Sequence, residues 1–211
     1  MFRSRVRRWP DVAVRVDDAR DRISRAVWDT VAELGIEATT VRAVAARAEC
    51  TTGLIMHRFG SRSEMLVHAR QTLFERTAAR ADSAGSARGT TAAERLVAVA
   101  CTALPLDDER VVEARIWTGF AAASIAHAEL RELHVHHTRQ WLARITEHVA
   151  RLDSRVDDAD ATAYAQQIVA AVEGVAVLAV LDSATYPPAV QERLVRSTIA
   201  DVVGRIAGAA P

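Results

Sequence analysis

Hydroxyl-bearing and basic side chains gather between residues 40 and 62 of this 211-residue chain. Hydroxyl groups and arginines hydrogen-bond to phosphate oxygens, and threonine, histidine and arginine also reach base edges in the major groove of DNA. The candidate DNA-contacting residues are Thr40, Thr51, Thr52, Gly53, Met56, His57, Arg58 and Arg62. This spacing indicates nucleic-acid recognition if two short helices joined by a tight turn carry these residues.

These residues are expected to take different roles. Thr51, Thr52 and His57 should lie near bases, with Met56 and Arg58 at the edge of the groove. Thr40 and Arg62 should hold phosphates through a hydroxyl, a guanidinium and helix N-terminal amides. Each residue alone could be an ordinary surface residue of a helical bundle, but that interpretation does not account for the whole ordered set.

Aromatic rings and one acid form a second group in the C-terminal half. Aromatic faces together with a carboxylate can hold a cation, and an apolar pocket can hold an apolar ligand. The candidate ligand-binding residues are Trp117, Phe120, Trp141, Ile145, Glu173 and Val177. The alternatives remain open: aromatic stripes at helical spacing usually form core, and Glu173 could make a structural ion pair or hydrogen bond.

Histidines and cysteines raise the question of metal or redox chemistry. The histidines are His127, His134, His136, His137 and His148. No cysteine lies nearby, so solvated histidines on a polar face are the simpler interpretation and we expect no metal and no cofactor. Cys50 is expected to be an apolar plug in a turn, with a thiol sensor as the minor alternative. The chain offers no nucleophile elbow, glycine-rich phosphate loop or paired catalytic carboxylates, so we expect no enzyme.

Hydrophobic spacing is helical almost throughout, and no stretch alternates like a strand, so the fold class is all-α. Thr40, Thr51 and Ser61 are expected helix N-caps, and Gly35 is expected to end the first helix. The expected helices after Gly35 cover residues 41–48, 52–59, 62–81, 92–103, 109–126, 129–152, 157–183 and 188–206.

Composition shifts divide the chain into three parts. Residues 1–16 form a basic arm, which could reach a minor groove or lie disordered. Residues 17–81 form a helix-turn-helix DNA-binding domain, and residues 82–211 form a helical-bundle domain for ligand binding and dimerisation. Residues 82–91, rich in Ser, Gly and Ala, are the expected linker.

The charges of the 27 basic and 27 acidic residues sum to zero, but the two kinds are unevenly distributed along the chain. Residues 1–80 hold 15 arginines against 10 acids, and the remainder holds 12 against 17. The two cysteines lie far apart and no secretory signal is apparent, so a reducing cytoplasm is expected. The apolar run 168–181 is short for a bilayer and contains Glu173, so we expect no membrane.

Residues 23–66 read ISRAVWDTVAELGIEATTVRAVAARAECTTGLIMHRFGSRSEML. This run resembles the tetracycline-repressor (TetR) family signature almost position by position. It departs at Glu49, where a turn glycine is usual, at Met56, where a tyrosine is common, and at Arg62, where a lysine is usual. Residues 116–145, with the later pair Glu173-Gly174, resemble the BetI-like subgroup.

The resemblance implies a repressor that dimerises through its last two helices and binds a double-stranded, inverted-repeat operator. It also implies release by a small-molecule effector, which we expect to be largely apolar, with a positive charge left open. The alternative is a small-molecule-binding helical protein whose DNA binding is weak or lost, an option to which Glu49 and Met56 lend weight.

Overall fold

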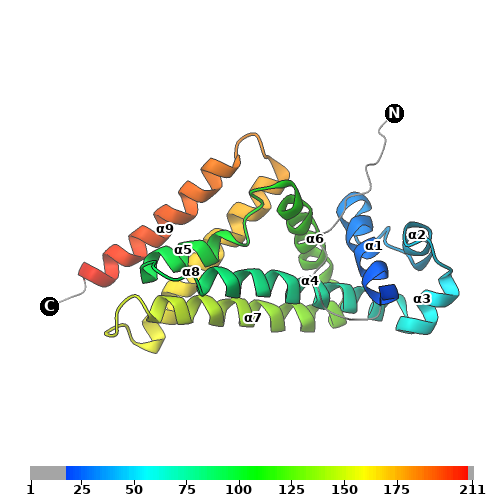
Figure 1. Ribbon diagram of the computed structural model, residues 1–211, viewed down its shortest axis with the longest axis horizontal. Helices are drawn as coiled ribbons and strands as arrows, with labels where there is room; N and C mark the ends of the chain where they lie inside the picture. Colours follow the sequence, from blue (N-terminus) through cyan, green and yellow to red (C-terminus); the bar gives the residue numbers. More distant parts are fainter. Residues whose placement is uncertain (1–17, 209–211) are drawn as a thin grey trace.

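A computed structural model describes residues 18–208, and these residues form nine α-helices and no strand (Figure 1). The all-α prediction is confirmed. The helices are α1 (Asp18–Leu34), α2 (Val41–Arg47), α3 (Thr52–Phe59), α4 (Arg62–Gly85), α5 (Ala92–Cys101), α6 (Asp108–Ser124), α7 (Ala128–Ala150), α8 (Asp158–Leu181) and α9 (Pro188–Gly208). The basic arm, residues 1–16, lies outside the described residues.

The predicted caps of the first helices are confirmed. The hydroxyl oxygens of Thr40, Thr51 and Ser61 accept hydrogen bonds of 3.0–3.1 Å from backbone N–H groups three residues later. Each bond satisfies a donor that has no partner inside its helix. Gly35 follows α1 with a φ of +80°, a conformation that glycine adopts without steric cost. Local sequence therefore fixes the end of α1 and the starts of α2, α3 and α4.

Helix α4 is longer than expected, and this corrects the predicted linker. Its last turn extends to Gly85, and the N–H of Ser86 closes it by donating to the carbonyls of Asp82 and Ser83 at 3.1 and 3.3 Å. Buried Ala81 anchors this turn in the core of the C-terminal half. The non-helical connection to α5 is thus only residues 86–91, and α4 is one rigid rod between the two halves.

Two apolar cores run through the molecule, and the first crosses the predicted domain boundary. It joins α1, α2, α3 and the first half of α4 to one face of α6, including buried Ile116 and Phe120. Helices α1 and α6 approach closely where Gly119 faces Val31: a Cβ on Gly119 would lie 3.2 Å from a Val31 methyl. The helix-turn-helix end therefore completes its core with a helix from the other half.

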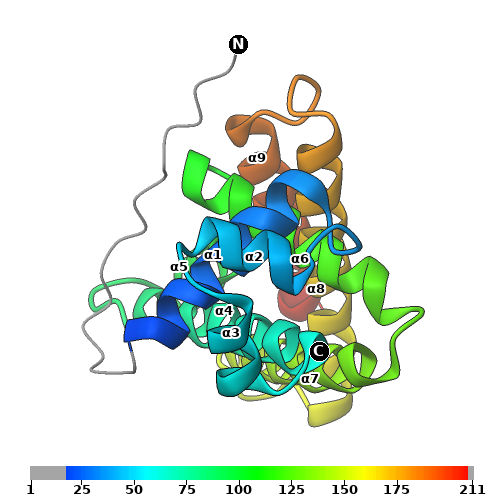
Figure 2. The same ribbon diagram turned by 90° about the vertical axis from the view of Figure 1, so that its right-hand side faces the viewer.

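The second core lies at the opposite end, where α5, α7, α8 and α9 meet the end of α4. In Figure 1, α1–α3 occupy one end of an elongated molecule and α9 the other, with α4 and α7 running side by side between them. In the end-on view of Figure 2, α1–α3 come to the front. The arrangement places the candidate DNA-contacting residues far from the C-terminal helices.

Helix α8 is apolar around most of its circumference but only half covered. Its buried face repeats through Ala161, Ala165, Ile168, Val172, Val175 and Ala179. By length and composition it is the single described helix that could cross a membrane, and 33% of its apolar window is buried within the chain. The opposite face exposes Val177, Leu178 and Leu181. On α9, Leu194 is exposed as well.

Candidate nucleic-acid interface and ligand site

Helix α3 presents its candidate DNA-contacting residues on one outer face. Thr51, Thr52, Gly53, Met56 and His57 are all exposed, and Met56 keeps 45% of its surface open. Ile55 and Phe59 point the other way, into the first core. An exposed helix with hydroxyl, imidazole and thioether groups in one row is suited to a major groove.

Arg58 and Arg62 are placed differently from this row. Arg58 is half-buried, and its carbonyl accepts a hydrogen bond of 2.9 Å from Arg20. The Arg62 guanidinium donates from Nε to the Thr39 carbonyl at 2.8 Å and from Nη2 to the Ile36 carbonyl at 2.5 Å. Arg62 thus fixes the loop before α2 to the start of α4. Its Nη1 remains available to donate a hydrogen bond to a phosphate. Its phosphate contact stays a prediction.

The turn between α2 and α3 keeps its shape without the family's usual glycine. Glu49 adopts a φ of +50°, in the left-handed region that favours glycine over residues with a Cβ. The N–H of Cys50 donates to the Ala45 carbonyl at 3.0 Å, and the Cys50 side chain packs against the first core. Cys50 therefore packs as the expected apolar residue of the turn. Because the usual glycine is absent, Glu49 adopts the unfavourable left-handed conformation.

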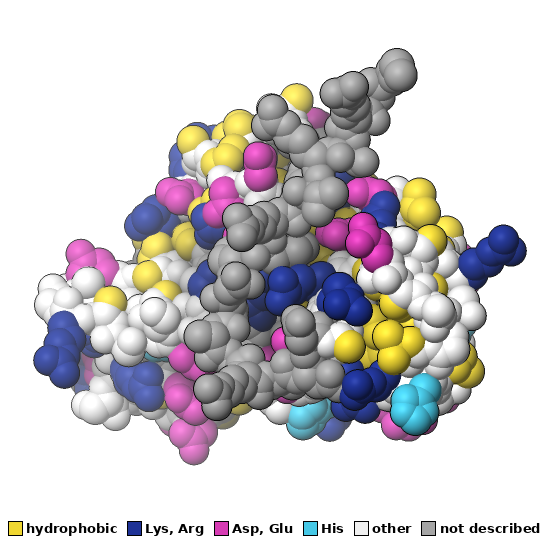
Figure 3. Space-filling model, turned by 45° about the vertical axis from the view of Figure 1, so that its right-hand side comes forward, with side chains coloured by type: hydrophobic (Ala, Val, Ile, Leu, Met, Phe, Trp, Pro, Cys, Tyr) yellow, Lys and Arg dark blue, Asp and Glu magenta, His cyan; other side chains and the backbone are white. Residues whose placement is uncertain are grey.

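Arg42 is a candidate that the sequence analysis missed. It lies in the first turn of α2, two residues after the exposed cap Thr40, and is itself exposed. Its position beside a helix N-cap was the available signal, since such turns commonly hold phosphate. Figure 3 turns the α1–α3 end of the molecule forward and shows basic side chains and histidine on this face.

The predicted aromatic site contains a cation that belongs to the protein. The guanidinium carbon of Arg70, on α4, lies 3.6 Å from the centroid of the Trp117 ring and 5.9 Å from that of Phe120. Arg70 is 3% exposed. Guanidinium groups stack on indole faces through cation–π attraction. The face of the Trp117 ring, which the sequence analysis assigned to a cationic ligand, is therefore already covered by Arg70 of the same chain.

The polar contacts of Arg70 are two histidines on α7. Arg70 donates from Nη1 to Nδ1 of His137 at 3.1 Å and from Nη2 to Nδ1 of His134 at 3.5 Å. Because Nδ1 of His137 accepts, its proton is on Nε2, which donates to Oε1 of Gln71 at 2.8 Å. Phe74 stacks on the same imidazole with ring centroids 3.9 Å apart. His137 is thus held as one neutral tautomer.

Burial dominates the protonation equilibria of this cluster. It lowers the pKa of Arg70 to about 9, and the field of Glu173 opposes the change. Burial, followed by the charge of Arg70, lowers the pKa of His137 to about 4. The same two causes lower the pKa of His134. At neutral pH the cluster therefore holds one cation and two neutral imidazoles.

Glu173 faces this cluster from α8 without pairing with it. Its side chain is exposed, yet surrounding protein atoms raise its pKa, opposed by the charge of Arg70. Desolvation disfavours the charged carboxylate, and it outweighs the opposing effect of Arg70. Among the described residues, no carboxylate oxygen lies within ion-pair distance of Arg70. The predicted structural ion pair of Glu173 is thus absent as a direct contact.

The other predicted ligand residues are not brought to this cluster. Trp141 and Ile145 belong to the second core, where Nε1 of Trp141 is buried without a hydrogen-bond partner. Val177 is exposed on α8. The structure therefore joins Trp117 and Phe120 around Arg70, with Glu173 nearby, and separates them from the other three.

Two buried charged residues in this region were missed by the sequence analysis. Arg70 follows Leu66 by four residues, on the apolar face of α4, and an arginine inside an apolar stripe was the signal. Glu113 is buried on α6 and pairs with Arg76 and Arg80 of α4. This ionic contact ties α4 to α6 about one and a half to three turns beyond Arg70.

The histidine interpretation needs correction. His137 and His148 are buried rather than solvated, because His137 partners Arg70 and His148 packs against Gly85. In the part of the chain that the structure describes, no three potential metal ligands lie close enough together to hold an ion.

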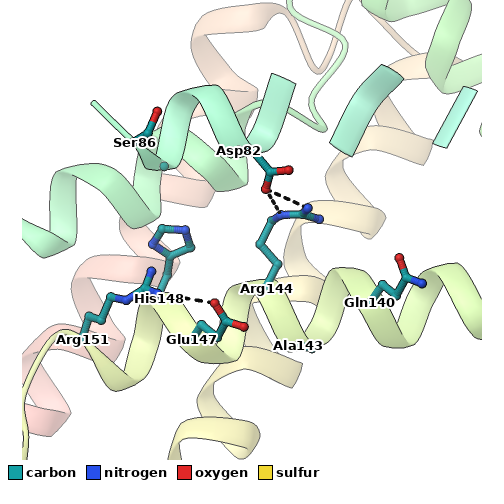
Figure 4. A pocket seen from close by; sticks show the side chains of 9 residues that line it. Asp82, Ser86, Gln140, Ala143, Arg144, Glu147, His148 and Arg151 are labelled. Atoms are coloured by element: carbon teal, nitrogen blue, oxygen red, sulfur yellow. Dashed lines mark hydrogen bonds and ion pairs between the residues drawn. The ribbon is translucent and has the colours of Figure 1, made fainter. Parts of the chain in front are cut away.

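A separate hollow of about 470 Å³ lies between the end of α4 and α7 (Figure 4). Its charged side chains already pair with one another, Arg144 with Asp82 at 2.8 Å and Arg151 with Glu147 at 3.4 Å. A ligand there would have to break these pairs, and no Phe, Tyr or Trp lines the hollow. The cluster around Arg70 is the better candidate.

Comparisons with known proteins agree with both halves. Residues 26–69 match the family described as bacterial regulatory proteins, tetR family, and residues 92–204 match the BetI-type transcriptional repressor, C-terminal. The HTH-type transcriptional regulator PksA of Bacillus subtilis (strain 168) is 23% identical over 163 residues, 77% of this chain and 79% of that protein.

Solved structures share the whole fold. A transcriptional regulator from Rhodococcus sp. Rha1 is 28% identical, with a TM-score of 0.80 over 88% of this chain and 96% of that one. A regulator from Saccharomonospora viridis, solved in complex with choline, is 20% identical, with a TM-score of 0.71 over 89% and 96%.

Proposed function

We propose, on the premise that this chain belongs to the TetR family of bacterial transcriptional regulators with a BetI-type C-terminal domain, that it binds an inverted-repeat operator as a homodimer. A small effector bound between α4, α6, α7 and α8 then releases the operator. The protein is a regulator and not an enzyme. The observation that carries the proposal is the row of exposed residues on α3, ordered as a DNA-reading helix requires.

Gel shift and salt titration with promoter DNA test the DNA-binding part. Thr52→Ala should relax base preference at a cost of about 1–3 kcal/mol, because Thr52 is placed to reach base edges. Arg42→Ala should weaken binding to every sequence and lower the salt slope by about one, as loss of one phosphate contact does. Arg42 is the better variant than Arg62, since Arg62 also holds a loop in place.

Equal affinity for promoter fragments and random duplex at all salt concentrations would contradict the proposal. That result would favour the alternative, a ligand-binding helical protein whose DNA binding is lost. The positive φ of Glu49 and the apolar Met56 on the reading face support that second candidate.

The homodimer is supported by the uncovered apolar faces of α8 and α9. Leu178 and Leu194 are 43% and 38% exposed in a single subunit, in helices whose other faces are fully buried. Covering these faces with the same faces of a second copy gives a closed two-fold assembly. The same coverage accounts for an apolar α8 in a cytoplasmic protein without a membrane.

The effector is proposed to be largely apolar because half-buried Trp117 supplies indole surface at the cluster. A positive charge on the effector remains one option, which the choline-bound Saccharomonospora viridis relative supports. Arg70 weighs against it, since its guanidinium already covers the Trp117 ring.

A further inference from the structure

We infer that the effector of this protein is an apolar carboxylate and that Arg70 binds its charge. The inference rests on the proposed function and names the chemical class that its site accepts. The observation is a buried guanidinium, 3% exposed, whose polar partners are two imidazoles rather than an acid. A buried cation without a matched anion is costly, and an anionic ligand would supply the missing partner.

Other arginines of the same helix show the usual solution. Arg76 and Arg80 lie one and a half to three turns further along α4, and both pair with the buried carboxylate of Glu113. Arg70 is more deeply buried than either, yet no described carboxylate reaches it. The sequence thus supplies an internal counter-ion for Arg76 and Arg80 and leaves Arg70 without a directly paired one.

The histidines cannot provide the missing negative charge. Both accept through Nδ1 and are neutral, and the pKa of each is lowered. The contact with His134, at 3.5 Å, is also at the limit of a hydrogen bond. A carboxylate oxygen at an ordinary charge-assisted distance would replace this weak contact at little loss.

Glu173 compensates the charge of Arg70 only from a distance. Its field reaches Arg70, but its side chain is exposed and forms no ion pair with it. Trp117 is half-buried and Glu173 is exposed, so two neighbours of Arg70 keep contact with solvent. Glu173 therefore sits at the approach to the cluster, where it repels an incoming anion without excluding it.

The composition of the cluster selects among anions. A guanidinium presents parallel N–H groups that fit a planar carboxylate through two hydrogen bonds. One cation balances one negative charge, so a phosphate dianion would bring a second charge that no described group matches. Trp117 is half-buried and leaves part of its indole for an apolar chain or ring, whereas Phe120 is enclosed in the first core. A cationic ligand would instead share its site with Arg70 and be repelled.

Binding at Arg70 can reach the DNA-binding end through α4. Arg70 and Arg62 are eight residues apart on one continuous helix, roughly 12 Å along its axis. Arg70 also touches α6 through Trp117 and α7 through His137. A carboxylate that binds Arg70 breaks its contact with His134. The packing of α4 against α7 then shifts, and Arg62 moves because it lies on the same helix.

The test uses matched ligands on the full chain. Hexanoate, octanoate, decanoate and phenylbutyrate are each compared with the amide and the amine of the same skeleton, by calorimetry and by thermal shift. We expect at least one carboxylate to bind at least tenfold more tightly than its amide, and the amines not to bind. Each ligand is then added to an operator titration, where the bound carboxylate should weaken DNA binding severalfold.

Variants link the effect to Arg70. Arg70→Met should lower carboxylate affinity at least tenfold while folding normally, because it replaces a buried charge by an apolar chain of similar length. Arg139→Met, at an exposed position of α7, is the matched control and should change nothing. Glu173→Gln should strengthen carboxylate binding, whereas a cation site would lose affinity on the same change.

The outcomes separate the inference from the proposed function. If an amine binds and weakens operator binding, the regulator is ligand-responsive but the carboxylate inference is wrong. If a carboxylate binds through Arg70 and leaves operator affinity unchanged, the inference holds and effector control of DNA binding fails. If no carboxylate of the panel binds, or Arg70→Met binds it equally well, the inference is overturned.

Discussion

Two residues of this molecule are held by the surrounding structure in states that are unfavourable for the stability of the fold. Glu49 holds a left-handed backbone conformation at the centre of the helix-turn-helix, and Arg70 holds a charge inside the protein. Neither residue improves the stability of the fold in an obvious way. Both lie where function is proposed, which is where such costs tend to concentrate.

Glu49→Gly should raise the free energy of unfolding by about 0.5 kcal/mol. Relief of a left-handed residue with a Cβ is worth about 1 kcal/mol, and the greater freedom of glycine in the unfolded chain offsets part of it. Urea denaturation measures the change. Glu49→Ala is the control, since it removes the same charge but keeps the strained Cβ. Equal stabilisation by both variants would mean that charge, not conformation, is responsible.

His137 should make the protein less stable in mild acid. Its pKa is about 4 in the folded protein and near its ordinary 6.5 when unfolded, because burial and Arg70 disfavour the imidazolium. Between these values the unfolded chain binds a proton that the native state does not. Stability is therefore complete above pH 6.5 and is lost as the pH falls, by about 2 kcal/mol at pH 5 relative to pH 7.

Urea denaturation at the two pH values tests this. His68, His134 and His148 also have lowered pKa values and act in the same direction, so the comparison must isolate His137. In His137→Gln the loss between pH 7 and pH 5 should shrink by that amount. An unchanged loss in the variant would show that the other histidines cause it.

At the scale of elements, the sequence predicted the positions of the helices along the chain more accurately than it predicted how the helices pack against one another. Caps and glycines are local signals, so α2, α3 and the starts of α4, α5 and α9 lie at or within a residue of expectation. The end of α4 was misplaced because Ser, Gly and Ala suggested a loop, whereas burial of Ala81 extends the helix.

The packing of α6 could not be predicted in the same way. Phe120 was expected in an aromatic ligand site and Ile116 lies one turn before it, but helical periodicity does not identify the helix on the other side. They contact the helix-turn-helix core rather than Trp141 and Ile145. Arg70 was missed although it lies on the apolar face of α4, because periodicity does not show which helices enclose that face and so does not show that the charge is buried.

Gly119 tests the contact between α6 and α1. A methyl group at this position would lie 3.2 Å from Val31, so Gly119→Ala should crowd the two helices and cost about 1 kcal/mol of stability. Val31→Ala removes the crowded methyl. We therefore expect the double variant to lose clearly less than the sum of the two single variants in thermal denaturation. Strict additivity would show that the helices separate freely at this point.

At the scale of the whole molecule, the uncovered faces of α8 and α9 should hold two copies together. Leu178→Arg should give monomers that remain folded, because Leu178 is exposed in one subunit and is proposed to be buried only between subunits. Positions such as Ala179 and Val195 would not serve, since both face their own core. Sedimentation at micromolar concentration measures the change.

Ile125→Arg is the matched control for this experiment. Ile125 is exposed at the end of α6, outside α8 and α9, and its replacement should leave the dimer intact. A monomeric wild type, or a Leu178→Arg protein that stays dimeric, would rule out the proposed interface.

The shared first core has a consequence for modular engineering of such regulators. A fragment ending at residue 81 would leave bare the surface of α1 and α4 that α6 covers, and it should aggregate when expressed alone. A chimera that joins the α1–α3 region of one relative to the C-terminal helices of another contains the same contact between α1 and α6. Its success depends on whether the transplanted α1 accepts the resident α6, so positions 31 and 119 must be exchanged as a pair.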